Sequence, residues 1–168
     1  MPKAAAVTHG VLCDTSFLIR WAKPDDALHP AAHAYLKYLV EGGHTLHVST
    51  IALAEYAVRD AIVNLPLKYF RVVPFNVDHA QRAGEFARAV FEARGALTPQ
   101  IGQRTIIPND TKMFAQADLA PEITHYLTAD GDCEKVYRLL KPVTNPHFQF
   151  VHLSTPWHQA FGQLDLTE

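Results

Sequence analysis

Apolar residues along the chain follow two patterns that alternate: short continuous runs, and longer stretches with apolar positions three and four residues apart. The first run, residues 11–13 (Val-Leu-Cys), is typical of a buried strand. Helical spacing follows through Trp21, and Thr15 or Ser16 is available to cap that helix. Asp14 therefore stands where a predicted strand gives way to a predicted helix.

The same alternation continues to the end of the chain. Further strands are predicted at residues 46–49, 69–75, 123–128 and 148–153, and the third strand of the chain has the proline expected at a sheet edge. Helices are predicted at residues 29–40, 50–58 with Thr50 as cap, 78–94 with Asp78 as cap, from Asn109 or Asp110 onward, and 136–140 up to Pro142.

Two segments lack a regular pattern. Residues 96–108 contain Pro99, Gly102 and Pro108, and they are predicted to form a loop. The tail, residues 154–168, carries Trp157 and Phe161, which either pack back on the domain or meet a partner. These aromatic side chains are expected to be core or interface anchors rather than platforms for stacking bases.

Strands that alternate with helices favour an α/β fold with a mainly parallel central sheet covered on both faces. With 168 residues the chain is long enough for one well-packed domain. We expect a single domain over residues 1–168, in which residues 154–168 are a C-terminal tail.

Composition narrows the functional classes. The formal charge is −2 and the pI is near 6.5, so no general basic field indicates a nucleic-acid binder. A cation bound among acids would still reverse the sign locally, which leaves a nucleic-acid substrate possible. Cys13 and Cys133 are too few for a disulfide framework. The chain has no apolar run near 18 residues and no signal-like start, so we expect a cytoplasmic protein without a membrane span.

Acidic residues stand just beyond several of the predicted strands. In a parallel sheet the carboxyl ends of the strands share one edge, so these acids would converge there. Clustered carboxylates repel one another and raise each other's pKa unless a cation neutralises them, and the hard cations Mg²⁺ and Mn²⁺ prefer oxygen ligands. The structural alternative is that each acid caps a helix or favours its macrodipole. The acids concerned are Asp14, Glu55, Asp110 and Asp130 or Asp132.

These segments resemble the successive acidic motifs of the PIN-domain ribonucleases, a family that includes the VapC-type toxins of toxin–antitoxin pairs. The resemblance covers the chain from about Val11 to about Leu153. The matching segments are Val11-Leu12-Cys13-Asp14-Thr15-Ser16, Ser49-Thr50-x4-Glu55, Asn109-Asp110-x4-Ala115-Gln116-Ala117 and Leu127-Thr128-Ala129-Asp130-Gly131-Asp132.

The resemblance implies a Rossmann-like α/β/α sandwich and Mg²⁺- or Mn²⁺-dependent cleavage of RNA by an activated water. Asp14, Glu55, Asp110 and Asp130 match the metal-coordinating and catalytic acids of the family, and Asp132 is a second candidate for the last position. It also implies an antitoxin that blocks the acidic cleft, and a homodimer.

Ser16 and Thr128 match hydroxyl positions that support the acids in the family. Two basic residues flank Asp110 and are candidates for contacts to substrate phosphate, although a solvated loop face explains them equally well. These are Arg104 and Lys112. The chain departs from typical toxins of the family by extra residues in the loop before Pro108 and after Leu153.

The leading hypothesis is a metal-dependent endoribonuclease, with the toxin of a toxin–antitoxin pair as its biological role. The alternative is a catalytically inert PIN-like module that binds RNA or protein. A receiver-type phosphate-handling domain fits less well, because the chain lacks an acidic pair at the end of the first strand. Histidines are expected to be solvated or hydrogen-bonded rather than metal ligands: His44, His47, His147 and His152.

Overall fold

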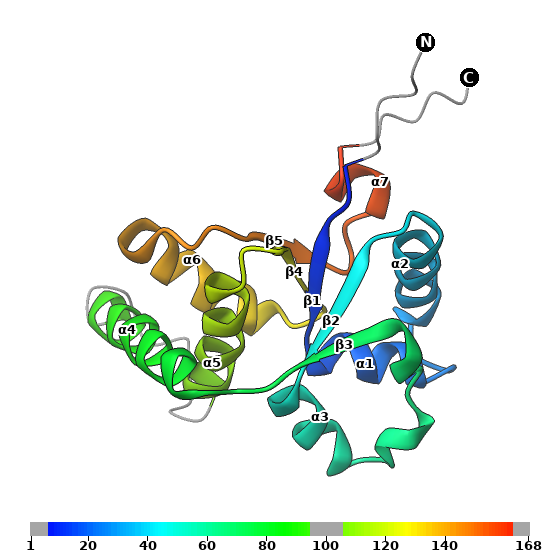
Figure 1. Cartoon of the computed structure of the whole chain (residues 1–168), viewed down its shortest axis with the longest axis horizontal. Coiled ribbons are helices and arrows are strands. Elements are labelled where there is room, and N and C mark those ends of the chain that lie inside the picture. Colours follow the sequence, from blue (N-terminus) through cyan, green and yellow to red (C-terminus); the bar gives the residue numbers. More distant parts are fainter. Residues whose placement is uncertain (1–6, 95–105, 163–168) are drawn as a thin grey trace.

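The computed structural model describes residues 7–94 and 106–162, and the strands in this part of the chain form one parallel sheet (Figure 1). The strand order is β3-β2-β1-β4-β5, with every neighbouring pair parallel. The strands are β1 (Gly10–Cys13), β2 (Thr45–Ser49), β3 (Phe70–Val73), β4 (Ile123–Thr128) and β5 (Gln149–His152). The predicted α/β fold with a parallel sheet is confirmed, and β3 lies at an edge as its proline indicated.

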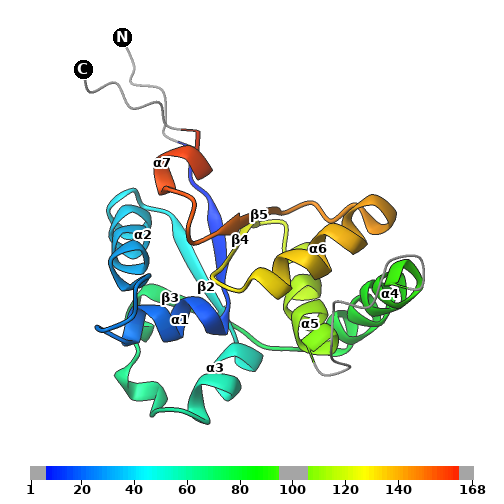
Figure 2. The same ribbon diagram turned by 180° about the vertical axis from the view of Figure 1, so that it is seen from behind.

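Helices lie on both sides of this sheet. The helices α4, α5 and α6 gather on one side, while α1, α2 and α7 lie on the other (Figures 1 and 2). The helices are α1 (Thr15–Ala22), α2 (His29–Glu41), α3 (Thr50–Ala57), α4 (Val77–Arg94), α5 (Ile106–Leu119), α6 (Gly131–Thr144) and α7 (Trp157–Ala160). Two short 3₁₀ turns, Ile62–Asn64 and Leu67–Tyr69, connect α3 to β3.

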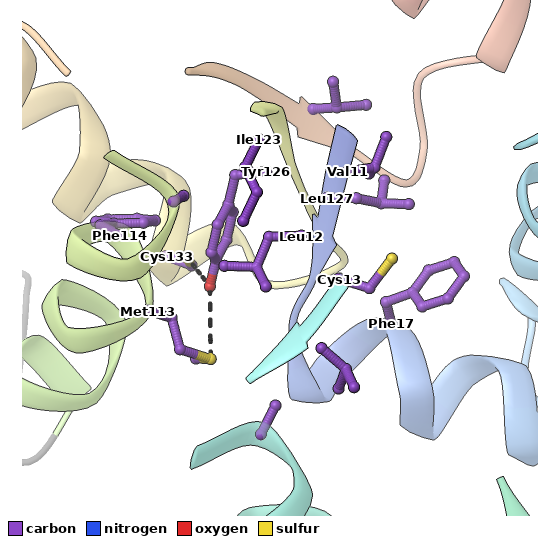
Figure 3. Packing of buried hydrophobic residues seen from close by; sticks show 14 of the residues in the cluster. Val11, Leu12, Cys13, Phe17, Met113, Phe114, Ile123, Tyr126, Leu127 and Cys133 are labelled. Atoms are coloured by element: carbon purple, nitrogen blue, oxygen red, sulfur yellow. Dashed lines mark hydrogen bonds between the residues drawn. The ribbon is translucent and has the colours of Figure 1, made fainter. Parts of the chain in front are cut away.

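The central strand β1 contributes side chains to the core on both faces of the sheet, because successive side chains of a strand point to opposite faces. Leu12 points toward Tyr126 and Met113, whereas Cys13 points toward Phe17 of α1 (Figure 3). All of these side chains are at most 2% exposed. Hydrophobic burial on two faces explains why β1 is apolar at every position rather than alternating.

The caps of α3 and α4 differ from the prediction, and the cap of α1 is the one expected under the structural alternative for Asp14. Asp14, and not Thr15 or Ser16, caps α1 by accepting a hydrogen bond from the backbone N–H of Phe17. Ser49 rather than Thr50 caps α3, and the Asn76 side chain rather than Asp78 accepts from the first turn of α4. In each case the cap is an earlier polar residue, because the residue expected to cap already has helical geometry.

Two helix boundaries that were predicted from prolines are wrong. Helix α5 begins at Ile106, so residues 106–108 belong to it rather than to the predicted loop. Pro108 is tolerated there because first-turn N–H groups need no partner within the helix. Likewise α6 runs past Pro142 to Thr144 and ends at Asn145, which adopts the left-handed conformation at φ 43°. The remainder of the predicted loop, residues 96–105, lies outside the described residues.

The C-terminal segment packs back on the domain. The Trp157 ring stacks on Tyr38 of α2 with centroids 4.2 Å apart. Phe161 lies among the rings of His9, His125 and Tyr38. This segment covers the amino ends of the strands, away from the acids, and residues 163–168 lie outside the described part.

The two cysteines are buried as free thiols on opposite sides of the sheet. Cys13 faces Phe17, whereas Cys133 lies beside the hydroxyl of Tyr126 (Figure 3). Burial raises the pKa of both thiols well above the ordinary value, so they stay protonated in the folded chain.

No helix in the described part of the chain is long and apolar enough to cross a membrane.

Gly10 is the position at which the fold requires a glycine most clearly. It begins β1 where the pairing with β4 shifts register, and a Cβ there would lie 2.0 Å from the backbone oxygen of Glu122. We expect Gly10→Ala to lower the free energy of unfolding by about 2 kcal/mol, because neither backbone can move without breaking strand pairs. Gly84→Ala is the matched control: nothing lies within 4 Å of its Cβ, and alanine should stabilise α4 by up to about 1 kcal/mol. Urea denaturation of both variants tests this pair.

Candidate active site

The strand order creates a crevice at the carboxyl ends of β1 and β4. The chain leaves β1 toward β2 on one side, and β4 occupies the other side. In open parallel sheets such a reversal of strand order is where ligands bind, because the connections diverge to opposite faces. Asp14 follows β1 directly, and Asp130 follows β4 after Ala129. A pocket of about 620 Å³ opens here and includes Ser16 and Asp130 in its wall.

Asp14 is held by three hydrogen bonds from two elements, α1 and β4. Its Oδ1 accepts from the Ser16 hydroxyl at 2.7 Å and from the Phe17 backbone N–H at 3.0 Å. Its Oδ2 accepts from the hydroxyl of Thr128. The two hydroxyls lie 3.1 Å apart, and Ser16 also accepts from the backbone N–H of Ala129. The structure thus places both predicted hydroxyl residues, Ser16 and Thr128, directly against Asp14.

Burial dominates the electrostatics of Asp14. The residue is 3% exposed, and loss of water raises its pKa to about 6 despite the hydrogen bonds that favour the carboxylate. The charge of Asp130 raises it further. Asp14 is therefore poised to ionise near neutral pH.

Glu55 links the segments that carry the other acids. Its Oε2 accepts a hydrogen bond from the hydroxyl of Thr15, next to Asp14. Its Oε1 accepts from the side-chain amide of Asn109 at 2.8 Å, next to Asp110. Glu55 therefore joins α1, α3 and α5, and acids far apart in the sequence meet at one end of the sheet.

Asp110 is the least compensated acid of the group. It is 8% exposed, and its Oδ2 is buried without a hydrogen-bond partner among the described residues. Burial raises its pKa to about 8, helped by the charges of Asp14, Asp130, Glu55 and Asp132 in that order. It lies in the second turn of α5, not in the predicted first turn, so it does not cap the helix.

Asp130 and Asp132 occupy different surroundings. Asp130 is partly buried, caps α6 by accepting from the N–H of Asp132 at 2.8 Å, and acts on the pKa of Asp14. Asp132 is half exposed and pairs with Lys135 at 2.7 Å. Asp130 lines the pocket and acts on Asp14, whereas Asp132 does neither, so Asp130 is the better candidate for the fourth position.

Most of the predicted histidines have hydrogen-bond partners, and the predicted basic residue that the structure describes is not among those that line the pocket. Arg104 lies outside the described residues. Lys112 is partly buried in α5, and it does not line the pocket beside Ser16. Most of the predicted histidines are hydrogen-bonded: His44 Nδ1 accepts from the N–H of His9, His147 lies 2.9 Å from the carbonyl of Ile123, and His152 contacts Ser154. His47 is buried, with Nε2 unpartnered among the described residues.

Sequence reasoning missed the polar residues that position the acids. Asn109 and Thr15 were seen as possible caps, but both donate to Glu55. Gln116, fully buried, accepts from Ser49 and donates to the carbonyl of Val73 at 2.9 Å, which ties α5 to the ends of β2 and β3. All three residues lie within the segments that resemble the family motifs, and this was the available signal. Buried polar side chains need hydrogen-bond partners, so these residues were candidates for contacts with the acids.

The donor set suits a hard divalent cation. Among residues 7–94 and 106–162, no group of three or more Asp, Glu, His or Cys side chains forms a ready-made metal site. Mg²⁺ needs fewer protein ligands, because it keeps several waters and binds through one or two carboxylates. Asp110 offers an unpartnered oxygen, and Asp14 Oδ2 accepts one hydrogen bond. These two residues fit the cation, which would also remove the cost of their mutual repulsion.

Comparison with known proteins identifies the fold. No family model matches the chain, and no curated protein matches it by sequence. Among solved structures, VapBC2 from Rickettsia felis bound to a promoter DNA fragment has a similar chain, with a TM-score of 0.58 at 17% identity over 86% of this chain and 98% of that one. DNA-bound VapBC from Salmonella typhimurium gives 0.53 at 16% identity over 88% and 99%.

A third structure is VapC20 from Mycobacterium tuberculosis, described as a sarcin-ricin loop cleaving toxin, with a TM-score of 0.48 at 18% identity over 74% of this chain and 93% of that one. The two likenesses with higher TM-scores show that the chain has the PIN-like fold that its acidic motifs predict.

The pKa of Asp110 gives the folded chain a distinctive pH dependence. In the unfolded chain the Asp110 carboxyl ionises near pH 4, whereas in the folded chain it holds its proton to about pH 8. Its contribution therefore destabilises the fold progressively between these pH values, because the unfolded state releases the proton first. We expect Asp110→Asn to raise the free energy of unfolding at pH 7.5 by about 2 kcal/mol, and to leave it unchanged near pH 4.

Urea denaturation in a metal-free buffer at several pH values measures this difference. Asp25→Asn, at an exposed turn residue, is the control that should show no comparable gain. A gain for Asp110→Asn that is the same at pH 4 and pH 7.5 would mean that the folded chain does not hold the Asp110 proton.

Proposed function

We propose that the chain is a metal-dependent endoribonuclease that hydrolyses RNA phosphodiester bonds, with Asp14 and Asp110 holding Mg²⁺ or Mn²⁺. The observation that carries the proposal is Asp110, a buried carboxyl whose Oδ2 has no hydrogen-bond partner within residues 7–94 and 106–162 and whose neighbours are further acids. A capping role explains Asp14 and Asp130, but no structural role explains Asp110. Such an arrangement is costly for a fold and useful for binding a cation.

Each residue of the site has a part in the proposed reaction. A bound divalent cation would polarise a phosphoryl oxygen and make a water more acidic. Ser16 and Thr128 fix the Asp14 carboxylate through their hydroxyls. Asp130 lines the pocket and can orient the attacking water or accept its proton. Glu55 holds α5 against α1, which keeps Asp110 facing Asp14.

RNA as substrate and a toxin role rest on likeness. The four acidic segments resemble those of PIN-domain ribonucleases, and the fold is shared with chains of VapBC complexes. We therefore propose that this chain is the toxin of a toxin–antitoxin pair, inhibited by a small protein that covers the acidic pocket. The homodimer implied by the resemblance remains a prediction.

The alternative function is an inert PIN-like module that binds RNA or protein without cleaving. The acids would then be retained only for the fold. Mn²⁺ binding separates the two functions, since an inert scaffold has no reason to keep a specific cation site.

Removing one acid should abolish both cation binding and cleavage. We expect Asp14→Asn and Asp110→Asn each to lose the Mn²⁺ binding seen by calorimetric titration and to cleave single-stranded RNA at least 100-fold more slowly. Asparagine keeps the size of the side chain, and in Asp14→Asn it remains a good helix cap. Thermal unfolding should therefore stay close to that of the parent chain at neutral pH, or rise for Asp110→Asn.

Asp25→Asn is the matched control and should retain full cleavage. A parent chain that takes up no Mn²⁺ and cuts no RNA would favour the inert module. Cleavage that survives both site variants would instead contradict the proposed roles of Asp14 and Asp110. Loss of folding together with activity would reassign these acids to structure.

A further inference from the structure

The pocket beside the acids is lined by two residues that the proposed reaction does not use. Besides Ser16 and Asp130, the lining of this pocket of about 620 Å³ includes Arg20 and Arg59. Arg20 lies on α1 and Arg59 lies just after α3. Two arginines beside an acidic centre are a combination that binds an anion extending beyond the centre itself.

Arg59 carries an uncompensated charge. It is exposed, and its guanidinium forms no ion pair with any residue of the described ranges 7–94 and 106–162. The nearest acid in sequence, Asp60, is already engaged by the hydroxyl of Tyr56, the backbone of Ala61 and the side-chain amide of Asn64. Arg59 is thus free to turn toward a ligand in the pocket.

Arg20 is fixed in position and keeps a donor unused. Its terminal nitrogen pairs with Asp26, whose other oxygen accepts from the backbone N–H of Leu28 at 2.9 Å. The Arg20 Nε is buried and has no hydrogen-bond partner among the described residues. The Arg20 side chain as a whole is 39% exposed, so its terminal N–H groups remain accessible to an anion in the pocket.

The remaining wall adds a weaker attraction. Gly131, which lines the pocket, is the first residue of the 14-residue helix α6. The backbone N–H groups of a helix's first turn and the positive end of its dipole favour an anion. Asp130, which also lines the pocket, is the opposing charge.

We propose that this pocket binds a backbone phosphate of the RNA strand next to the phosphate being cleaved, with Arg59 as the main contact and Arg20 as the second. The proposal rests on the proposed function, because the strand is the anion that would reach the acids and the arginines together. A guanidinium group can donate two parallel hydrogen bonds to two oxygens of one phosphate. The negative charge of Asp130 disfavours a small free anion, whereas an RNA strand is also held by its contacts elsewhere in the site.

RNA binding without cleavage tests the proposal. In the Asp14→Asn chain, fluorescence anisotropy with a labelled single-stranded 20-mer measures the dissociation constant at several salt concentrations. We expect the added change Arg59→Gln to raise that constant about 5-fold to 10-fold and to lower the salt slope by about 1, because one phosphate contact is lost. Arg59→Lys should fall between them, since it keeps the charge without the paired donors.

Arg88→Gln is the matched control, an exposed arginine of α4 that does not line the pocket. Equal effects of Arg59→Gln and Arg88→Gln would overturn the phosphate site while leaving the nuclease intact. An equal loss for a poly-aspartate peptide would instead assign the pocket to an acidic protein segment. Failure of the parent chain to bind or cleave the 20-mer in the presence of Mn²⁺ would overturn both proposals.

Steady-state cleavage gives a second readout on the otherwise unchanged chain. Arg59→Gln should raise KM for the 20-mer several-fold with a smaller change in kcat, because the contact positions the strand rather than the reacting atoms. A dinucleotide has no second phosphate, so Arg59→Gln should leave its cleavage unchanged. An equal effect on both substrates would contradict the proposed contact.

Discussion

Mutual repulsion among buried carboxylates is the constraint on which the site depends. The order of strands brings the carboxyl ends of β1 and β4 together, so the acids that follow these strands lie close to one another. Hydrogen bonds relieve Asp14, Glu55 and Asp130, each of which has at least one donor. Asp110 has the most strongly raised pKa of these acids, and its Oδ2 has no hydrogen-bond partner in the described part of the chain. The unfavourable electrostatic energy of the group is therefore concentrated at this side chain. A cation is the simplest means of relieving it.

Capping and chemistry are not competing explanations for these acids. Asp14 and Asp130 cap α1 and α6, and each is placed by the same turn that ends a parallel strand. An acid at a strand-to-helix turn can therefore cap the helix and at the same time lie at the crevice. The structural role fixes the carboxylate's direction, which is what a binding site requires. Asp110 lacks that double role, and for this reason the proposed cation site rests on Asp110 rather than on the two helix caps.

The fold was predictable from the sequence to the extent that it depends on local periodicity. The apolar runs around Leu12 and Tyr126 and the helical spacing after Asp14 led to a parallel α/β sheet, and the sheet is as expected. Helix boundaries at Pro108 and Pro142 were wrong. A proline in a first turn, such as Pro108, costs little, and α6 continues for two residues beyond Pro142.

The site was less accessible to sequence reasoning. The convergence of the acids followed from strand topology, but the link from Glu55 to Thr15 and Asn109 depends on how three helices meet. The pocket arginines were missed altogether, because Arg20 and Arg59 belong to no motif and gain their meaning from a shared wall.

The reactivity of the two buried thiols can be used to measure local unfolding of the chain. A thiol reacts as its thiolate, and Cys13 and Cys133 are both shielded and held protonated by burial. Alkylation can proceed only when a helical layer lifts from the sheet, and each thiol reports on the layer that covers it. Labelling rates at the two positions would therefore show whether the layers separate independently or together.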